Sequence, residues 1–162
     1  MGDSRRFQVF AQFISKQFPH QDTHIADVAG GKGDLQLALR ELGYTNVTTF
    51  DKRKKKKITR GVRYQHRWFD TGVKQDFNLL LGMHPDEATD VIVVEAARRS
   101  IPFAIVPCCV MPNAITFWGQ HNYRTWLSWL ETNASKRGHR VERFYLNIQG
   151  KNTVLLGRLK GE

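Results

Sequence analysis

The sequence predicts an α/β fold with a mostly parallel seven-stranded sheet, an antiparallel C-terminal strand and helices on both faces. Two observations predict it. Short apolar segments alternate with segments of helical periodicity along most of the chain, the pattern of repeated strand–helix–strand units. The chain then closes with two strand-like segments around a turn at 150–152, the pattern of a hairpin. We expect one domain over 1–162, with an N-terminal helix at about 4–19 and no separate recognition domain.

The elements of the first half follow from apolar spacing and from glycine positions. Phenylalanines recur at helical spacing within 4–19, and residues 24–28 form a short apolar strand segment. A run of small residues follows, and then a helical pattern continues to about Leu42, where Gly43 fits a C-cap. β-branched residues predict a second strand at 46–50.

The second half continues the alternation. The basic segment after the second strand is expected to form a loop and a short helix. A continuous apolar run then suits a central strand buried on both faces. The expected elements are a third strand within 61–69, a fourth strand at 76–82, a helix at 86–99, a fifth strand at 102–107, a helix at 122–136, and strands at 141–148 and 153–159.

The positive charge is concentrated in one segment. The formal net charge is +10, and residues 52–67 hold nine Lys or Arg and no Asp or Glu, which leaves +1 for the rest. Such a patch is typical of a polyanion-binding surface, with a solvated loop as the alternative. We predict that this segment contacts the RNA backbone through Lys54, Lys55, Lys56, Lys57 and Arg60.

Several features bear on location. No apolar run approaches the roughly 20 residues of a membrane span, and no signal-like apolar region follows the N-terminus. The two cysteines, Cys108 and Cys109, are adjacent, and neighbours in a strand point to opposite faces and rarely pair. We therefore expect a cytoplasmic protein that contacts no membrane and has no disulfide framework.

The clearest ligand signature is the glycine turn that joins the first strand to the next helix. Glycines let the backbone pass close to a ligand, and open α/β sheets bind ligands beyond the carboxyl ends of their strands. A P-loop needs Ser or Thr where this chain has Gly33. A dinucleotide fingerprint needs a third glycine that is missing here, and Asp34 at the helix start would repel a pyrophosphate.

Residues 27–33, Asp-Val-Ala-Gly-Gly-Lys-Gly, resemble the first motif of class I S-adenosylmethionine-dependent methyltransferases, with Ala29 replacing the first glycine. The resemblance implies a Rossmann-like fold and S-adenosyl-L-methionine as cofactor. That cofactor is cationic and lacks phosphate, so acidic groups are compatible with it. Asp51, 18 residues past Gly33, suits the ribose hydroxyls, and Asp70 resembles the residue that meets the adenine amino group. The candidate cofactor-binding residues are Asp27, Ala29, Gly30, Gly31, Gly33, Asp51, Lys52, Phe69, Asp70 and His84.

Two later segments narrow the resemblance. Residues 81–90 and 103–110 resemble a group of these enzymes in which a His-x-Cys-Gly-x-x-Thr-Asp segment precedes a Pro-Cys-Cys segment. The group includes a tRNA 2′-O-methyltransferase family and methyltransferase-like proteins. The resemblance covers about residues 24–112, and it departs where Pro85 and Asp86 stand near the family's Cys-Gly.

The candidate catalytic residues are His84 and Cys108. A neutral histidine at the end of the fourth strand can take a proton from the methyl acceptor, while a histidine that only shapes the turn is the alternative. For Cys108, covalent attack on a pyrimidine and zinc binding with His84 or His121 are both less favoured than simple packing. Two adjacent cysteines do not easily chelate one ion, so no metal is predicted.

The sequence therefore predicts a methyltransferase that acts on RNA by direct transfer to an oxygen or nitrogen acceptor. Two alternatives remain open. One is a methyltransferase for a protein or a small molecule, and the other is a non-catalytic RNA-binding module that keeps the fold. Because no recognition domain is expected, a homodimer or a partner subunit is expected to supply specificity.

Overall fold

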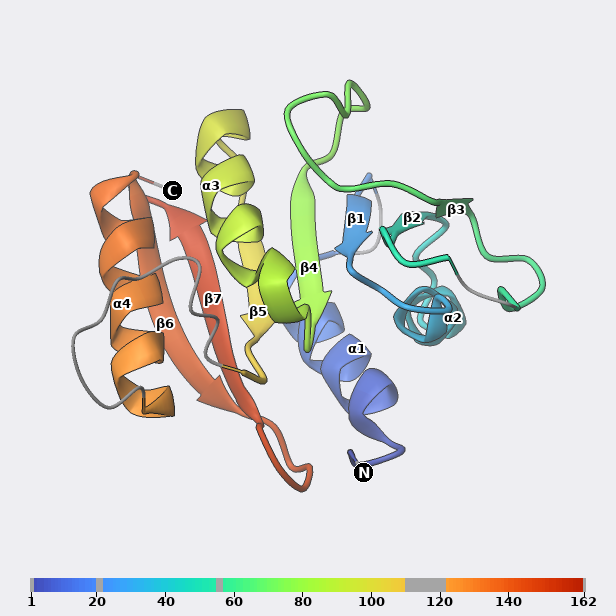
Figure 1. Ribbon diagram of the computed structural model, residues 1–162, viewed down its shortest axis with the longest axis horizontal. Coiled ribbons are helices and arrows are strands. Elements are labelled where there is room, and N and C mark those ends of the chain that lie inside the picture. Colours follow the sequence, from blue (N-terminus) through green and yellow to red (C-terminus); the bar gives the residue numbers. More distant parts are fainter. Residues whose placement is uncertain (1, 20–21, 55–56, 110–121, 162) are drawn as a thin grey trace.

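The computed structural model describes residues 2–19, 22–54, 57–109 and 122–161. Within these residues, seven strands form one sheet in the order β3-β2-β1-β4-β5-β7-β6 (Figure 1). Strands β1 to β5 run parallel to one another, and β7 is antiparallel to both β5 and β6. The predicted sheet is confirmed. Its strands are β1 (His24–Val28), β2 (Asn46–Phe50), β3 (Tyr64–Gln65), β4 (Leu79–Met83), β5 (Phe103–Val106), β6 (His139–Tyr145) and β7 (Thr153–Leu159).

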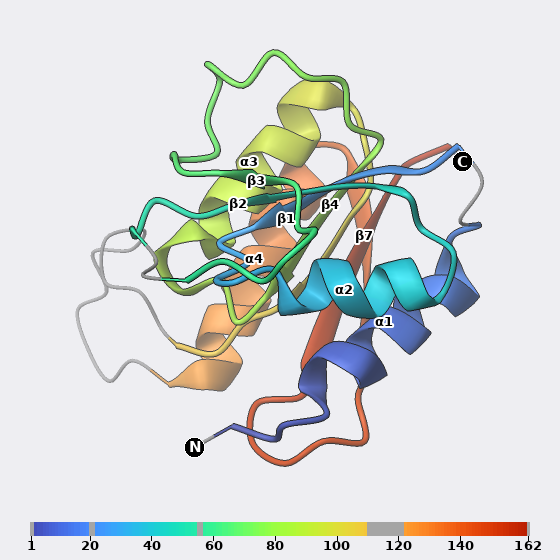
Figure 2. The same cartoon turned by 90° about the vertical axis from the view of Figure 1, so that its right-hand side faces the viewer.

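Helices cover both faces of the sheet, as predicted. Figure 2 shows α1 and α2 on one side of the sheet and α3 and α4 on the other. The helices are α1 (Arg6–Gln17), α2 (Asp34–Glu41), the short 3₁₀ helix η1 (Asp86–Ala88), α3 (Thr89–Arg99) and α4 (Tyr123–Lys136). Asn122 caps α4 by accepting a hydrogen bond from the Thr125 backbone N–H.

Two apolar clusters fill the space between the sheet and the helices. Along β1, Ile25 joins the cluster beneath α1 and α2, and its neighbour Ala26 joins the cluster beneath α3 and α4. This alternation is the period-two geometry of a strand that is buried on both faces. Since β1 lies between β2 and β4, their carboxyl ends meet at one edge of the sheet.

The structure differs from the sequence prediction mainly between β2 and β4. The third strand is only Tyr64–Gln65, and the described part of the basic segment contains no helix. Dense like charge opposes a helical turn, because residues three and four apart would face each other. The predicted helix at 86–99 is divided between η1 and α3. No helix of the described chain combines the length and apolar character that crossing a bilayer requires.

Candidate functional site

The glycine turn after β1 needs its glycines for separate reasons. A Cβ on Gly30 would lie 2.0 Å from Oδ2 of Asp27, so only glycine fits over that carboxylate. Gly33 has a φ of 90°, and a Cβ there would lie 2.4 Å from Cγ1 of Val62. Gly31 has a φ of 65° and no heavy atom within 4 Å of its ideal Cβ position. The turn is thus packed from below at two glycines and open at the third.

Asp27 supports this turn from beneath. Its side chain is fully buried and accepts a hydrogen bond of 3.0 Å from the Thr49 hydroxyl. No hydrogen-bond partner for its Oδ1 atom exists in the described part of the chain. Burial raises the pKa of Asp27 to about 7, against the effect of the Thr49 hydrogen bond. Asp27 therefore lies beneath the turn and lines neither of the two surface hollows at this edge of the sheet.

Asp51 joins the end of β2 to the same turn. Its side chain is 2% exposed, and Oδ2 accepts a 3.0 Å hydrogen bond from the Gly31 backbone N–H. Oδ1 accepts one of 2.7 Å from the Arg53 backbone N–H. The structure therefore brings Asp51 to the glycine turn, where the sequence spacing predicts it.

Two hollows lie at this edge of the sheet and share Ala29 and Arg53 among their lining residues. The first lies between the ends of β2 and β4 and is lined in part by aromatic side chains. The second lies over the glycine turn and beside α1. Lining residues of the first include Phe50, Asp51, Lys52, Trp68, Phe69 and Glu87, and those of the second include Phe7, Gly30, Gly31, Lys32, Asp34 and His84.

Aromatic side chains form part of the first hollow. Phe69 is 2% exposed and packs edge-on against Phe50, with ring centroids 5.0 Å apart. Trp68 is 42% exposed, and Nζ of Lys52 lies 4.1 Å from its ring centroid. Asp70 instead closes its own turn by accepting a 2.8 Å hydrogen bond from the Gly72 backbone N–H. Asp70 is not among the residues that line this hollow.

Arg53 is a site residue that the sequence analysis did not nominate individually. Its Nε lies 3.3 Å from Oδ1 of Asp51, and its Nη1 lies 3.5 Å from Oδ2 of Asp86. Lys52 beside it pairs with Glu87. The two cations connect the residues after β2 with the loop after β4. The sequence feature that could have identified Arg53 as a site residue is its position two residues after Asp51.

In the rest of the basic segment, the backbone of Arg63 is hydrogen-bonded to α2, whereas several basic side chains are exposed at the surface. Buried Gln36 of α2 donates a 2.9 Å hydrogen bond to the Arg63 carbonyl and accepts one of 2.6 Å from its backbone N–H. The same Gln36 amide donates to the Thr49 hydroxyl. The side chains of Lys54, Lys57 and Arg60 are exposed. Lys55 and Lys56, the other predicted RNA contacts, lie outside the described residues.

His84 lies directly after β4 and lines the second hollow. It has a φ of 55°, and its backbone N–H donates to the Val106 carbonyl. Its Nε2 lies 3.0 Å from the Lys151 carbonyl oxygen, which can only accept a hydrogen bond. Nε2 therefore carries the proton, and in the neutral ring the lone pair is on Nδ1.

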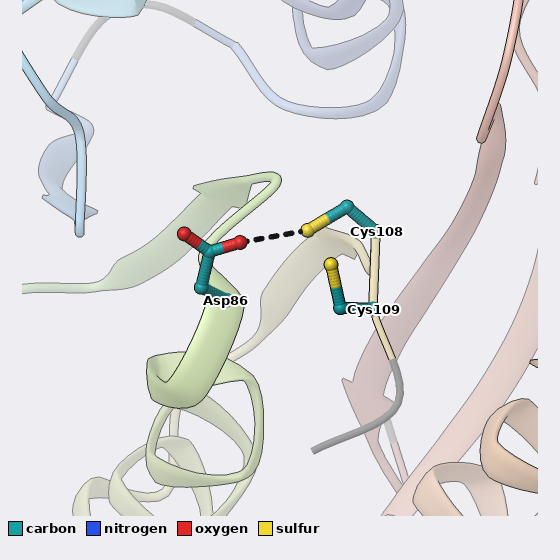
Figure 3. Close-up of side chains that lie close together, drawn as sticks. All are labelled: Asp86, Cys108 and Cys109. Atoms are coloured by element: carbon teal, nitrogen blue, oxygen red, sulfur yellow. Dashed lines mark hydrogen bonds between the residues drawn. The ribbon is translucent and has the colours of Figure 1, made fainter. Parts of the chain in front are cut away.

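The two cysteines converge on Asp86. Sγ of Cys108 donates a 3.0 Å hydrogen bond to Oδ1 of Asp86, and the Cys109 sulfur lies on the same side (Figure 3). The expectation that adjacent cysteines point to opposite faces is wrong here, because β5 ends at Val106 and the cysteines lie beyond its strand geometry. Burial raises the pKa of the Cys108 thiol far above its usual range, so this thiol is protonated. His121 lies outside the described residues.

No family model and no curated protein matches this chain. Solved structures match its fold. Ribosomal protein L11 methylase from Lactobacillus delbrueckii subsp. bulgaricus aligns with a TM-score of 0.69 at 14% identity, over 99% of this chain and 81% of that one. DesVI from Streptomyces venezuelae gives 0.64 at 11% identity, over 96% and 93%. Precorrin-6y C5,15-methyltransferase from Geobacter metallireducens gives 0.62 at 13%, over 92% and 83%. The chain therefore has the Rossmann-like fold of methyltransferases with different substrates.

Proposed function

We propose that this chain is an S-adenosylmethionine-dependent methyltransferase that methylates RNA in the cytoplasm. The observation that carries the proposal is the pair of adjoining hollows at the carboxyl ends of β1, β2 and β4. One hollow offers aromatic rings and a carboxylate, which suit a nucleoside. The other offers open glycine backbone and acidic and polar groups, which suit a charged amino-acid moiety. S-adenosylmethionine has both parts in one molecule.

The residues present fit this cofactor. A Cβ would face open space at Gly31, so the backbone there is accessible to a ligand. Asp34 in the first turn of α2 disfavours a phosphate at that helix end. Asp51, Lys52 and Phe69 line the first hollow, and we assign Asp51 to the ribose hydroxyls and Phe69 to the adenine. When bound, this cofactor supplies a methyl group on a positively charged sulfur.

The remaining predicted cofactor contacts have different relations to the hollows. Ala29 and Gly30 line the second hollow, whereas Asp27 and Gly33 act on the cofactor through the turn that they hold in shape. Asp70 does not line the first hollow, so a cofactor contact by Asp70 requires its side chain to turn toward that hollow.

His84 is the proposed proton acceptor for the methylated group. Its Nε2 is held by the Lys151 carbonyl, which leaves Nδ1 with the lone pair that a general base needs. Without a bound metal, we assign Cys108 to the acceptor side as a neutral thiol, since its raised pKa opposes a thiolate nucleophile. Methyl transfer to a lone pair depends mainly on positioning, so one weak base is sufficient.

The basic segment supports RNA as the substrate. Lys52, Arg53 and Arg67 line the first hollow, and exposed Lys54, Lys57 and Arg60 extend the positive charge away from it. Lys55 and Lys56 complete the proposed phosphate contacts. A second copy of the chain or a partner subunit would select the RNA. Following the resemblance of the His84 and Pro-Cys-Cys segments, the ribose 2′-hydroxyl of tRNA is the first acceptor to test.

Isothermal titration with S-adenosylmethionine tests the cofactor assignment. We expect binding by the wild-type chain and about tenfold or greater loss in Asp51→Ala, because a charged hydrogen-bond acceptor is removed from a buried position. Asp76→Ala, which changes an exposed carboxylate, is the matched control. Thermal melting must show that Asp51→Ala is folded. Absence of binding, or equal binding by folded Asp51→Ala, would reject the proposal.

Transfer of a radiolabelled methyl group to cellular RNA, protein and small-molecule fractions tests the substrate. RNA is expected to carry the label, and His84→Ala is expected to slow transfer even at saturating cofactor, since His84 is both a predicted cofactor contact and the proposed proton acceptor. Label in the protein or small-molecule fraction would favour the alternative of a methyltransferase that acts on a protein or a small molecule. Cofactor binding without transfer to any fraction would favour the non-catalytic module.

A further inference from the structure

We propose that Asp86, Cys108 and Cys109 form a binding site for one zinc ion. Their three potential ligand atoms lie within 4.8 Å of one another (Figure 3). Zinc–sulfur and zinc–oxygen bond lengths place neighbouring ligands of a tetrahedral ion about 3.5 Å apart. The Cys108 sulfur and Oδ1 of Asp86 are already 3.0 Å apart. A rearrangement of about 1 Å would therefore bring the three atoms around one ion.

The backbone fixes the two halves of this site relative to each other. Asp86 follows β4 and the cysteines follow β5, and these parallel strands pair as far as Met83 and Val106. Asp86 has a φ of 50°, an unusual conformation for a residue other than glycine. The ligands thus come from two adjacent strand ends of a buried sheet, which is a rigid support for a metal site.

The charges around the cluster balance when the ion is present. Two thiolates and one carboxylate bring three negative charges, and zinc brings two positive ones. Arg53 supplies the remaining positive charge, with Nη1 3.5 Å from Oδ2 of Asp86. The two oxygens of Asp86 then have separate tasks, since Oδ1 faces the sulfur and Oδ2 faces the arginine. A ligand carboxylate oriented by a second partner is a common feature of metal sites.

The ligand set selects the metal and its coordination. Thiolates favour zinc over magnesium or calcium, and the two thiol protons pass to solvent when the ion binds. Across the described ranges, no fourth His, Cys, Asp or Glu joins the cluster. Three ligands from the described ranges leave one position of a tetrahedral ion for a further ligand, such as water or substrate.

The position of the cluster connects the open coordination site with methyl transfer. Asp86 lines the first hollow, which is proposed to hold the nucleoside of the cofactor, and Cys108 is assigned to the acceptor side. Zinc lowers the pKa of a bound hydroxyl, which would make an acceptor oxygen a better nucleophile. This role rests on the proposed function, whereas metal binding itself does not.

Cobalt(II) titration of the reduced, chelator-treated chain is the test, with Co²⁺ as the probe and Zn²⁺ as the competitor. The chain contains two cysteines, so any thiolate-to-cobalt charge-transfer absorption must come from Cys108 and Cys109. We expect one Co²⁺ per chain, displaced by one equivalent of Zn²⁺. Cys108→Ser and Cys109→Ser are each expected to reduce the absorption strongly.

Asp86→Asn and Asp90→Asn form the matched pair. Asn tolerates a positive φ, so Asp86→Asn should keep the fold, which thermal melting verifies. We expect Co²⁺ affinity to fall about tenfold or more in Asp86→Asn and to stay unchanged in Asp90→Asn. Asp90 lies in the first turn of α3, outside the cluster.

Three outcomes would overturn the proposal: no thiolate–cobalt absorption, undiminished affinity in Asp86→Asn, or one metal shared by two chains. S-adenosylmethionine titration on the same preparations separates the two hypotheses. Cofactor binding without Co²⁺ binding rejects only the metal site, and Co²⁺ binding without cofactor binding rejects only the methyltransferase assignment.

Discussion

Gly31 and Gly33 show two different reasons for a glycine in a turn, which are a positive φ and a lack of room for a side chain. Both have positive φ, but only Gly33 lacks room for a methyl group, because of Val62. We predict that Gly31→Ala lowers the free energy of unfolding by about 1–2 kcal/mol, the cost of the left-handed conformation. Gly33→Ala should lose about 2–5 kcal/mol, since overpacking is added. Urea unfolding measures both, and equal losses would contradict the clash.

Asp27 should make the stability of the protein depend on pH. Its pKa in the folded state is about 7, and its ordinary value is 3.8, so the native state binds the proton more tightly. Stability from this group is therefore present below about pH 4 and is lost as the pH rises to about 7. The loss amounts to about 4 kcal/mol in the free energy of unfolding.

Asp27→Asn provides the comparison for this pH effect. The asparagine cannot ionise, so the wild type should lose stability relative to this variant between pH 4 and 7.5. Urea unfolding at several pH values measures the difference. A difference that stays constant across this range would show that Asp27 does not titrate there.

Sequence reasoning located single residues well where spacing along a strand determines position. Asp51 could be placed because it ends a strand whose neighbour carries the glycine turn. The convergence of Cys108 and Cys109 could not, because it depends on β5 ending two residues earlier than the cysteines. The bridge from Arg53 to Asp86 also needs three-dimensional information, since 32 residues lie between the two in the sequence.

At the scale of elements, α2 holds the start of β3 through one side chain, Gln36. We predict that Gln36→Leu lowers the free energy of unfolding by about 1–3 kcal/mol, because the backbone of Arg63 and the hydroxyl of Thr49 lose their partner. Amide exchange at 58–65 should accelerate. Gln12→Leu, on the exposed side of α1, should change stability by less than about 0.5 kcal/mol. Equal effects of the two changes would contradict the role of Gln36.

The connection after β2 should influence cofactor affinity through Arg53. Arg53 shares the carboxylate of Asp51 with any ribose hydroxyl and adds positive charge beside a cationic cofactor. We predict that Arg53→Gln strengthens S-adenosylmethionine binding about two- to fivefold, as expected for release of a half-exposed ion pair. Titration calorimetry measures it, with exposed Arg60→Gln as the control. Weaker binding would instead identify Arg53 as a cofactor ligand.

Sequence periodicity predicted most elements because each buries a regular apolar face. β1 and β2 have their predicted bounds, and α4 begins one residue after the predicted start at 122 and ends at the predicted 136. Residues 61–69 were harder, because β3 is a two-residue edge strand whose side chains are only half-buried. Its position depends on the Gln36 contact with Arg63, which no local pattern reveals.

At the scale of the whole molecule, the basic segment should dominate RNA affinity. We predict that changing Lys54 and Lys57 to Gln reduces the slope of log affinity against log salt by about 1.4, for two lost contacts to single-stranded RNA. A double change of Lys16 and Lys136 to Gln removes the same charge from the ends of α1 and α4, and should leave the slope nearly unchanged. Filter binding over a salt series measures it. Equal slopes for both doubles would show that the basic segment is not the contact surface.

The adjacent cysteines also make the chain convenient for spectroscopy. Cys109 is exposed, whereas Cys108 is half-buried and hydrogen-bonded to Asp86. Thiol reagents need access and a thiolate, so a fluorophore should attach to Cys109 first, without any engineered residue. The dye would then lie at the carboxyl edge of the sheet. Its emission could report in real time when a ligand occupies the neighbouring hollows.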